Sequence, residues 1–240
     1  MIKPKAILLD FYGTVVEEDE KPVTLISKEI SEASNKSASL TEVASYWWRV
    51  FGELFTNSHG GSFQKEKELG QSSALSTMKF FDADLDGEKL IQKLSDYWDE
   101  YWGKPAMFPE SNDVLAKLSE YDMPICLVSN IDNAVLDSAL MHNKLDFELV
   151  VTSEDCRSYK PRPEMFQKAL SLLNLSNKEV LHVGDSLRAD VKGAKWMEIP
   201  VLWLNRKNRA MTDQPEKPDF VSTDLNGIID VLEYFGVLKR

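Results

Sequence analysis

An apolar run that ends in a carboxylate and a glycine stands near the start of the chain, where residues 6–15 read AILLDFYGTV. Four successive apolar residues predict a short strand that is buried on both faces. Gly13 permits the backbone to reverse just past the end of that strand. Because ligands of open parallel sheets bind at the carboxyl ends of the strands, Asp10 is predicted to lie at a functional edge. Considered alone, Asp10 is explained equally well as the cap of a turn.

Three later stretches favour the functional interpretation. They read LVSN at residues 127–130, KP at 160–161 and VGDSLRAD at 183–190, each after an apolar, strand-like run. Together with residues 10–14 they resemble, in order, the motifs of the haloacid dehalogenase (HAD) superfamily of hydrolases. The first motif is similar to the Asp-x-Tyr-Gly-Thr form of the 2-haloacid dehalogenases rather than to the Asp-x-Asp-Gly-Thr form of other members. The resemblance extends from Asp10 to beyond Asp190, and residues 15–105 show no comparable motif.

The composition is that of a globular protein with one sizeable core and a smaller second domain, since 43% of its 240 residues are hydrophobic. Its two cysteines, Cys126 and Cys156, fit neither a metal site nor a disulfide framework. No apolar run approaches the roughly 20 residues of a membrane span. The net charge of −11 disfavours nucleic acid and anionic membranes as partners. We therefore expect a soluble, cytoplasmic protein that acts as a monomer or homodimer.

Two kinds of periodicity divide the chain. Helical spacing predicts four helices over residues 24–34, 41–55, 64–79 and 88–102. From residue 105 onward, strands at 125–129, 149–152, 180–183, 201–204 and near 220 alternate with helices at 113–121, 134–141, 164–173, 190–197 and 225–235. This alternation predicts an α/β fold with a doubly wound, Rossmann-like parallel sheet. We expect a core domain of residues 1–15 and 105–240. The resemblance implies that residues 16–104 form an inserted helical cap.

The motifs place two carboxylates at one edge of the predicted sheet. Asp10 and Asp185 each end a strand and would repel each other unless a cation or a proton lay between them. Oxygen ligands favour Mg²⁺, which keeps several waters and binds substrate phosphates. Asp190, one helical turn further on, is expected to hold the metal-bound waters, and the resemblance implies the backbone carbonyl of Tyr12 as another ligand. The alternative is that residues 184–186 form a helix-capping loop.

Other motif residues are candidates for binding an anionic substrate. Lys160 precedes a proline that stiffens its loop, and the resemblance places its ammonium beside Asp10, where it would neutralise the nucleophile and a bound anion. Ser129, with Asn130 after it, offers a hydroxyl and backbone N–H groups to an anionic oxygen, or else closes a turn. We also assign Thr14, in the first motif, to substrate binding.

Arg49 is a further candidate in the predicted helical segment. The pair Trp48-Arg49 resembles the arginine with which dehalogenases bind the halide or carboxylate, but a surface arginine or a phosphate clamp explains it equally. The three histidines, His59, His142 and His182, are interpreted as non-catalytic. His182 lies within a predicted strand beside apolar neighbours, and the other two lie in polar stretches with no paired aspartate or cysteine.

The resemblance implies covalent catalysis, in which Asp10 attacks the substrate and water hydrolyses the aspartyl intermediate. Two family chemistries compete. Phosphatases carry a second carboxylate two residues after the nucleophile, where this chain has Tyr12. A phenol, whose ordinary pKa is about 10, is a poor base for the water step. In dehalogenation the leaving halide needs no proton, so a tyrosine at this position is no disadvantage.

Other positions oppose dehalogenation. The dehalogenases have a sequence similar to Ser-Ser-Asn at the position where this chain has Gly184-Asp185-Ser186. They also have a tyrosine shortly after the lysine, where this chain has Phe166. Since converging carboxylates are costly without a cation, we give Asp185 more weight than Tyr12. The sequence thus predicts Mg²⁺-dependent hydrolysis of a small phosphate monoester, with an anionic metabolite as substrate. The alternatives are dehalogenation and a binding or regulatory protein that has lost turnover.

Overall fold

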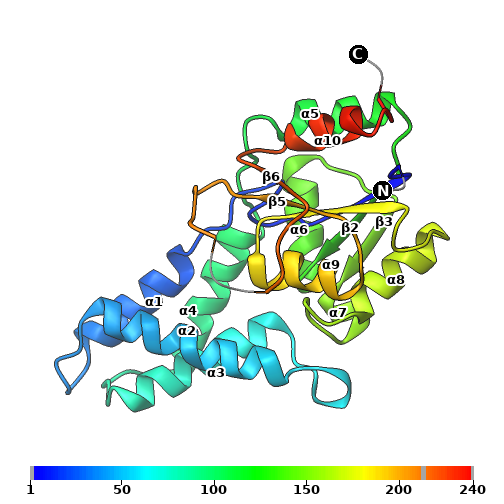
Figure 1. Ribbon diagram of the computed structural model, residues 1–240. Helices are drawn as coiled ribbons and strands as arrows, with labels where there is room; N and C mark the ends of the chain where they lie inside the picture. Colours follow the sequence, from blue (N-terminus) through cyan, green and yellow to red (C-terminus); the bar gives the residue numbers. More distant parts are fainter. Residues whose placement is uncertain (1–2, 212–214, 239–240) are drawn as a thin grey trace. The chain divides into compact units, whose positions relative to one another are not determined.

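The chain folds into two compact units, and the computed structural model describes residues 3–211 and 215–238 (Figure 1). One unit comprises Met1–Glu17, Ala106–Asn130 and Leu145–Arg240, and it contains the sheet. The other comprises Glu18–Pro105 and Ile131–Lys144 and is helical. The domain boundaries at residues 15 and 105 stay a prediction.

Six strands form one parallel sheet, in the order β3-β2-β1-β4-β5-β6. The strand order changes direction at β1, and this confirms the predicted doubly wound α/β fold. The strands are β1 Ala6–Leu9, β2 Ile125–Ser129, β3 Leu149–Thr152, β4 Val180–Gly184, β5 Val201–Leu204 and β6 Phe220–Ser222.

Strand β1 lies inside the sheet, between β2 and β4, which explains its continuous apolar sequence. Ala6 and Leu8 belong to a core cluster with Met165, Phe166 and other residues on one face of the sheet. Side chains alternate along a strand, so Ile7 and Leu9 project from the other face. All four residues of β1 are fully buried. Burial on both faces is the environment that an unbroken apolar strand requires.

Helices cover both faces of this sheet (Figure 1). Helices α5 (Ser111–Glu120) and α10 (Gly227–Tyr234) lie on one face, and α7 (Ser153–Cys156), α8 (Glu164–Leu173) and α9 (Lys192–Trp196) lie on the other. The helix predicted at residues 190–197 begins earlier, with a π-helical turn at Leu187–Val191. The reason is Ser186, whose hydroxyl accepts the Ala189 N–H at 3.1 Å and caps this turn.

The helical unit contains α1 (Lys21–Glu32), α2 (Leu40–Asn57), α3 (Glu66–Phe80), α4 (Gly87–Tyr97) and α6 (Asn133–Asn143), with a 3₁₀ turn at Gly60–Ser62 and a π-helical turn at Trp98–Trp102. Ser39 and Glu42 form a reciprocal capping box, so α2 starts one residue before the predicted position. Trp47 and Trp98 are fully buried in this unit, whereas Trp48 is 40% exposed. The packing of its amphipathic helices therefore depends strongly on aromatic side chains.

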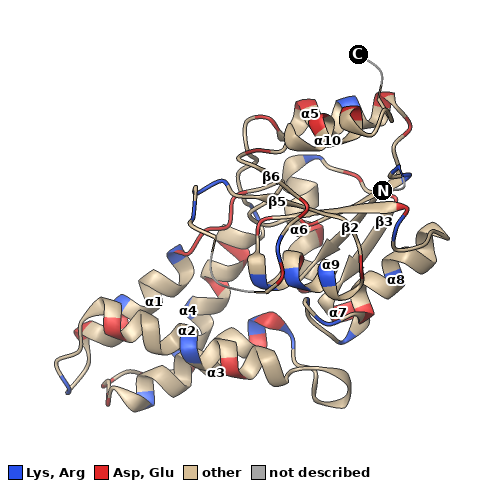
Figure 2. Ribbon diagram, in the orientation of Figure 1, with Lys and Arg blue, Asp and Glu red and all other residues tan. Residues whose placement is uncertain are grey.

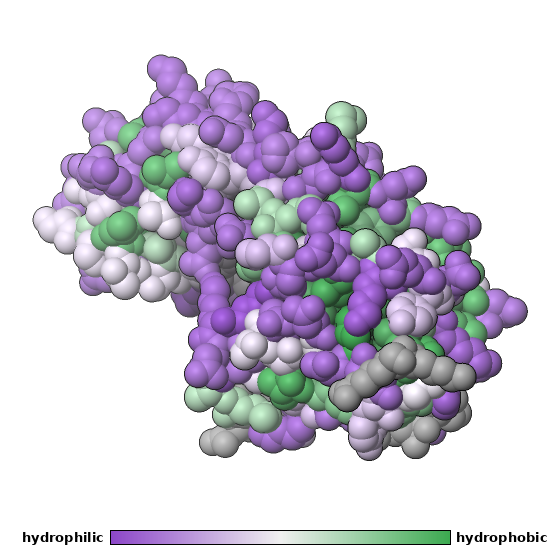
Figure 3. Space-filling view, turned by 90° about the horizontal axis from the view of Figure 1, so that it is seen from above, coloured by the Kyte–Doolittle hydropathy of each residue, from purple (hydrophilic) through white to green (hydrophobic). Residues whose placement is uncertain are grey.

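The surface is mixed in charge and polarity. Basic and acidic residues are interspersed along the helices (Figure 2), and hydrophilic residues predominate on the face drawn in Figure 3. Among the residues described, no helix has both the length and the apolar character needed to cross a membrane.

Candidate active site

The candidate site lies at the carboxyl edge of the sheet, where β1, β2 and β4 end side by side. Leu9 in β1 is paired with Leu127 in β2 and with Val183 in β4. Asp10 follows Leu9, and its backbone N–H donates to the Val183 carbonyl at 2.9 Å. The strand ends thus place Asp10 beside the segments that carry the second and fourth motifs, as the sequence predicts.

The turn after β1 depends on Gly13. Its φ of +74° lies in the left-handed region, which glycine enters without strain. A Cβ at this position would lie 2.7 Å from the Cγ of Asp185, so no larger residue fits without displacing that carboxylate. Gly13 is therefore required both for the turn and for the approach of Asp185 to the end of β1.

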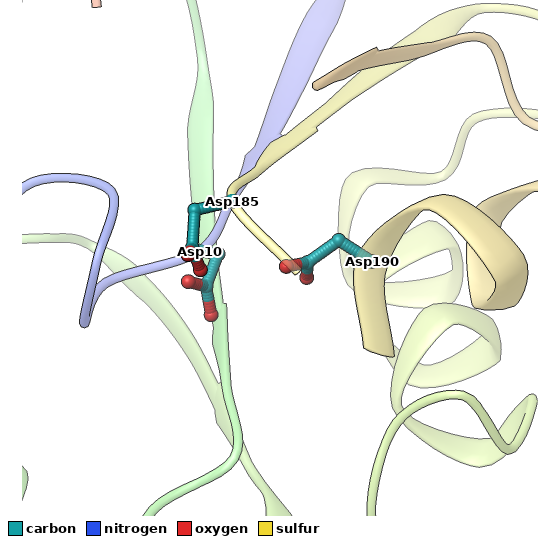
Figure 4. A group of neighbouring side chains, drawn as sticks. All are labelled: Asp10, Asp185 and Asp190. Atoms are coloured by element: carbon teal, nitrogen blue, oxygen red, sulfur yellow. The ribbon is translucent and has the colours of Figure 1, made fainter. Parts of the chain in front are cut away.

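Three carboxylates converge at this edge (Figure 4). Oxygen atoms of Asp10, Asp185 and Asp190 all lie within 4.8 Å of one another. Asp10 comes from the end of β1, Asp185 from the residue after β4 and Asp190 from the π-helical turn that follows. Gly184 allows this arrangement, because a Cβ there would lie 2.2 Å from the Cγ of Asp190. Such a group of oxygen ligands is typical of a site for a divalent cation.

Lys160 joins two of the three carboxylates. Its ammonium donates to Asp10 Oδ1 and to Asp190 Oδ1, both at 2.7 Å, and to the Val128 carbonyl at 2.8 Å. These bonds use all three of its donors, and the side chain is only 1% exposed. Asn130 fixes the backbone of Lys160 from both sides, accepting its N–H at 2.8 Å and donating to its carbonyl at 3.3 Å.

The charges of this cluster depend on one another. Burial raises the pKa of Asp10 to about 7; Lys160 counteracts this effect, and the neighbouring Asp190 and Asp185 add to it. Burial would also raise the pKa of Asp190, but Lys160 and His182 together hold it well below its usual range. Burial disfavours the charge of Lys160, yet the two aspartates keep the pKa of its ammonium above the ordinary value. A further cation near Asp10 would therefore favour its ionised, nucleophilic form.

The remaining candidates occupy different positions. Thr14 is fully buried, and its hydroxyl donates to Asp10 Oδ2 at 3.1 Å, so it orients this carboxylate. Ser129 is buried at the end of β2. Tyr12 is half-buried, with its ring edge-on to Phe11. Their roles toward a substrate stay predictions.

Arg49 belongs to the helical unit, on α2. Its guanidinium donates to Glu53 at 2.7 Å and lies over the Tyr46 ring, 4.5 Å from the centroid. These are the contacts of a surface arginine, one of the two alternatives to the dehalogenase role that the sequence allows.

Sequence reasoning missed three residues at the sheet edge. His182, interpreted only as a strand residue, places Nε2 at 2.9 Å from Asp190 Oδ1. Arg209 donates to the backbone carbonyl of Asp185 at 2.7 Å and to its Oδ2 at 3.3 Å. Arg206 donates to the Thr14 carbonyl at 2.6 Å and pairs with Glu110 at 2.7 Å. A signal was present for His182, since a polar side chain in a strand buried on both faces requires a partner.

A family model described as haloacid dehalogenase-like hydrolase matches residues 4–197. The chain is 24% identical over 240 residues to haloacetate dehalogenase H-2 of Moraxella sp. (strain B), covering 97% of this chain and 99% of that protein. It is 36% identical over 89 residues to glyceraldehyde 3-phosphate phosphatase of Pyrococcus furiosus, covering 36% of this chain and 37% of that protein.

Solved structures share the fold. The HAD-hydrolase YfnB from Bacillus subtilis, solved with magnesium, has a TM-score of 0.74 at 19% identity, with 97% of this chain and all of that chain covered. Several other similar structures are L-2-haloacid dehalogenases. The similar proteins thus include both dehalogenases and phosphatases, and the family is common to them. With four motifs assembled at one sheet edge and a family model matching residues 4–197, this chain belongs to the haloacid dehalogenase-like hydrolases.

Proposed function

We propose that the protein is a Mg²⁺-dependent phosphatase that hydrolyses a small phosphate monoester at a slow to moderate rate, with Asp10 as nucleophile. The observation that carries this proposal is Asp185, which brings a third carboxylate to within 4.8 Å of Asp10 and Asp190. Lys160 is the only fully buried cation described beside them, and Arg209, with a side chain 45% exposed, reaches only Asp185. Three converging carboxylates supply hard oxygen ligands, and a divalent cation would offset the repulsion between them.

The donor set fits Mg²⁺. Asp10 and Asp185 would supply one carboxylate oxygen each and Tyr12 its backbone carbonyl, a hard oxygen set with room for waters and a substrate oxygen. Asp190 has fewer free lone pairs, because Oδ1 accepts from Lys160 and Oδ2 accepts the Ser186 N–H at 3.0 Å. Asp190 would therefore act on the ion indirectly, by accepting hydrogen bonds from metal-bound water or by orienting the other residues of the site. When bound, Mg²⁺ would offset negative charge on the transferring phosphoryl group and on Asp10.

The residues of the chain define the two chemical steps. A carboxylate oxygen of Asp10 forms a bond to phosphorus while the bond from phosphorus to the leaving oxygen breaks, giving an aspartyl phosphate. Thr14 and Lys160 hold the carboxylate of Asp10 in one orientation during this attack. Ser129 would bond an oxygen of the phosphoryl group, and Lys160, whose three donors are already used, would offset its negative charge from beside Asp10. Water then attacks phosphorus, releases inorganic phosphate and restores Asp10.

Tyr12 sets the rate and the choice of leaving group. A phenol can donate a proton to the leaving oxygen, but it is a poor base for the water step at neutral pH. Esters whose leaving group departs without a proton, such as aryl phosphates, should therefore react faster than alkyl phosphates. We propose slow to moderate turnover because Tyr12 is a poor base for the water step.

Dehalogenation of a 2-haloacid is the second candidate, and two observations favour it. Tyr12 occupies the position of the usual phosphatase carboxylate, and a relative that matches along almost its whole length is named a haloacetate dehalogenase. Asp185 argues against it, because an unscreened carboxylate raises the pKa of Asp10 and weakens it as a nucleophile.

A turnover assay of the purified protein tests the proposal. We expect phosphate release from an aryl phosphate in Mg²⁺, slower release from an alkyl phosphate, and loss of both activities in EDTA. Halide release from a 2-haloacid in EDTA, abolished by Asp10→Asn and by Arg49→Ala, would establish the dehalogenase instead. Binding of Mg²⁺ and phosphate analogues without turnover of any ester or haloacid would identify a binding or regulatory protein.

Asp185→Asn tests the proposed metal ligand separately. Replacing one anionic ligand should weaken Mg²⁺ binding by about tenfold to a hundredfold. Titration calorimetry with Mg²⁺ measures this, with the exposed Asp113→Asn on α5 as a matched control that should not change the affinity. If the wild-type protein bound no Mg²⁺, or if Asp185→Asn did not change the affinity for Mg²⁺, the proposed metal site would be wrong.

A further inference from the structure

A buried series of polar contacts runs from β4 to the nucleophile. His182 Nε2 lies 2.9 Å from Asp190 Oδ1, the same oxygen accepts from Lys160 at 2.7 Å, and Lys160 donates to Asp10 at 2.7 Å. The side chains of His182, Asp190 and Lys160 are at most 1% exposed. Water is therefore not available to replace any one of these contacts, and each group depends on its neighbours.

The direction of the first bond follows from the contacts of Asp190. Its Oδ1 accepts from the Lys160 ammonium at 2.7 Å and its Oδ2 accepts the Ser186 N–H at 3.0 Å, so both oxygens act as acceptors. His182 Nε2, which faces Oδ1 at 2.9 Å, must therefore carry a proton and donate it to this hydrogen bond.

The geometry leaves Asp190 little freedom. Its Oδ1 accepts from both His182 and Lys160, and its Oδ2 accepts from the Ser186 backbone. The His182 ring is itself held edge-on by Phe166, with centroids 5.1 Å apart at an interplanar angle of 82°. Of the three donors to Asp190, one is a backbone group at its own helix start. The other two are His182, fixed in a strand, and Lys160, fixed on a loop.

We propose that His182 is a positioning residue, which acts through Asp190 to hold the Lys160 ammonium against Asp10. The proposal rests on the proposed function for the choice of assay, but it applies to any substrate that Asp10 attacks. Without the donor on His182, Asp190 Oδ1 keeps only its contact with Lys160, while Oδ2 still accepts the Ser186 N–H. Asp190 would hold the Lys160 ammonium less firmly, and the carboxylate of Asp10 would be oriented less well for attack.

Two conservative variants separate this role from simple packing. The amide nitrogen of glutamine can reach the place of the imidazole Nε2, whereas the amide of asparagine is one methylene too short. Both variants lose the ring contact with Phe166 and both keep a polar group in β4. Asparagine also leaves a larger void than glutamine at this fully buried position, so the two variants are compared in thermal unfolding as well, and a loss of kcat beyond the loss of stability reports the bond to Asp190.

We expect His182→Asn to lower kcat with an aryl phosphate by about tenfold to a hundredfold, as for other groups that orient a catalytic side chain. His182→Gln should retain kcat within a few-fold of the wild type. The KM should change little in either variant, because His182 does not touch the substrate. His142→Asn, on α6 in the other unit, is the matched control and should leave both constants unchanged. Equal kcat values in the folded Gln and Asn variants would overturn the proposal.

A measurement that needs no turnover keeps this inference separate from the proposed function. In ¹⁵N-labelled wild-type protein, the NMR signals of the His182 ring should show a proton on Nε2. A proton on Nδ1 instead would overturn the proposal, even if one of the variants fails to fold. If no phosphate ester reacts but a 2-haloacid does, the same two variants are compared by halide release. The phosphatase assignment then fails while the role of His182 is still decided.

Discussion

Asp10→Asn is expected to reduce hydrolysis of an aryl phosphate by at least about a thousandfold, because an amide oxygen is a far weaker nucleophile than a carboxylate. The substitution preserves the shape of the side chain. The amide oxygen can still accept from Lys160, and the amide NH2 that replaces the other oxygen can donate to the Thr14 hydroxyl. The variant should therefore fold. Initial rates of phosphate release at saturating Mg²⁺ measure the effect, and thermal unfolding checks the fold.

Asp113→Asn serves as the control, since it makes the same chemical change on the exposed first turn of α5. It should leave the rate unaltered. A folded Asp10→Asn protein that retained a substantial fraction of the wild-type rate would show that another group attacks the substrate, and the assignment of the nucleophile would be wrong.

Tyr12→Asp is expected to act in the opposite direction. It supplies the carboxylate that phosphatases of this family carry two residues after the nucleophile. A positioned acid-base group contributes about 10²–10⁴-fold, so hydrolysis of alkyl phosphates should rise by a factor in this range. Aryl phosphates should gain less in the first step, because their leaving group departs without a proton. The ratio of the two rates, measured in the wild type and the variant, isolates the effect.

Tyr12→Phe completes the comparison. It removes the phenolic proton without adding charge, so it should lower alkyl phosphate turnover if Tyr12 donates to the leaving group. In a dehalogenase, Tyr12→Asp would instead place another negative charge beside Asp10 and lower halide release. A Tyr12→Asp protein that gained no alkyl phosphatase activity would count against a phosphatase site.

The residues of the four motifs could be placed from the sequence because strand ends determine their position. Asp10 and Asp185 follow apolar runs, and parallel strands bring their carboxyl ends to the same edge of a sheet. Lys160 could be placed through the resemblance alone, since nothing in its local sequence predicts that its ammonium is buried between Asp10 and Asp190. Its position depends on contacts between segments about 30 and 150 residues apart.

The contacts around the motif residues were beyond local sequence reasoning. The loop from residue 207 to 218 reads as a polar surface segment, yet Arg209 returns from it to Asp185, and the adjacent Arg206 binds the Thr14 carbonyl. The sequence places His182 in a strand, as observed, but not beside Asp190, because the chain leaves β4 and enters the following π-helical turn between the two residues. These pairs are set by the packing of β4, β5 and the loops after them, which has no periodic signal in the sequence.

The most direct test of the central claim is the covalent species that forms on Asp10. The protein is mixed either with an aryl phosphate in Mg²⁺ or with a 2-haloacid in EDTA, quenched in acid within a turnover, digested and examined by mass spectrometry. The account predicts a phosphoryl group on the peptide that contains Asp10, formed only with Mg²⁺ and absent from Asp10→Asn. A carboxyalkyl ester on Asp10, formed from the 2-haloacid in EDTA with no phosphoryl adduct in the other sample, would contradict it.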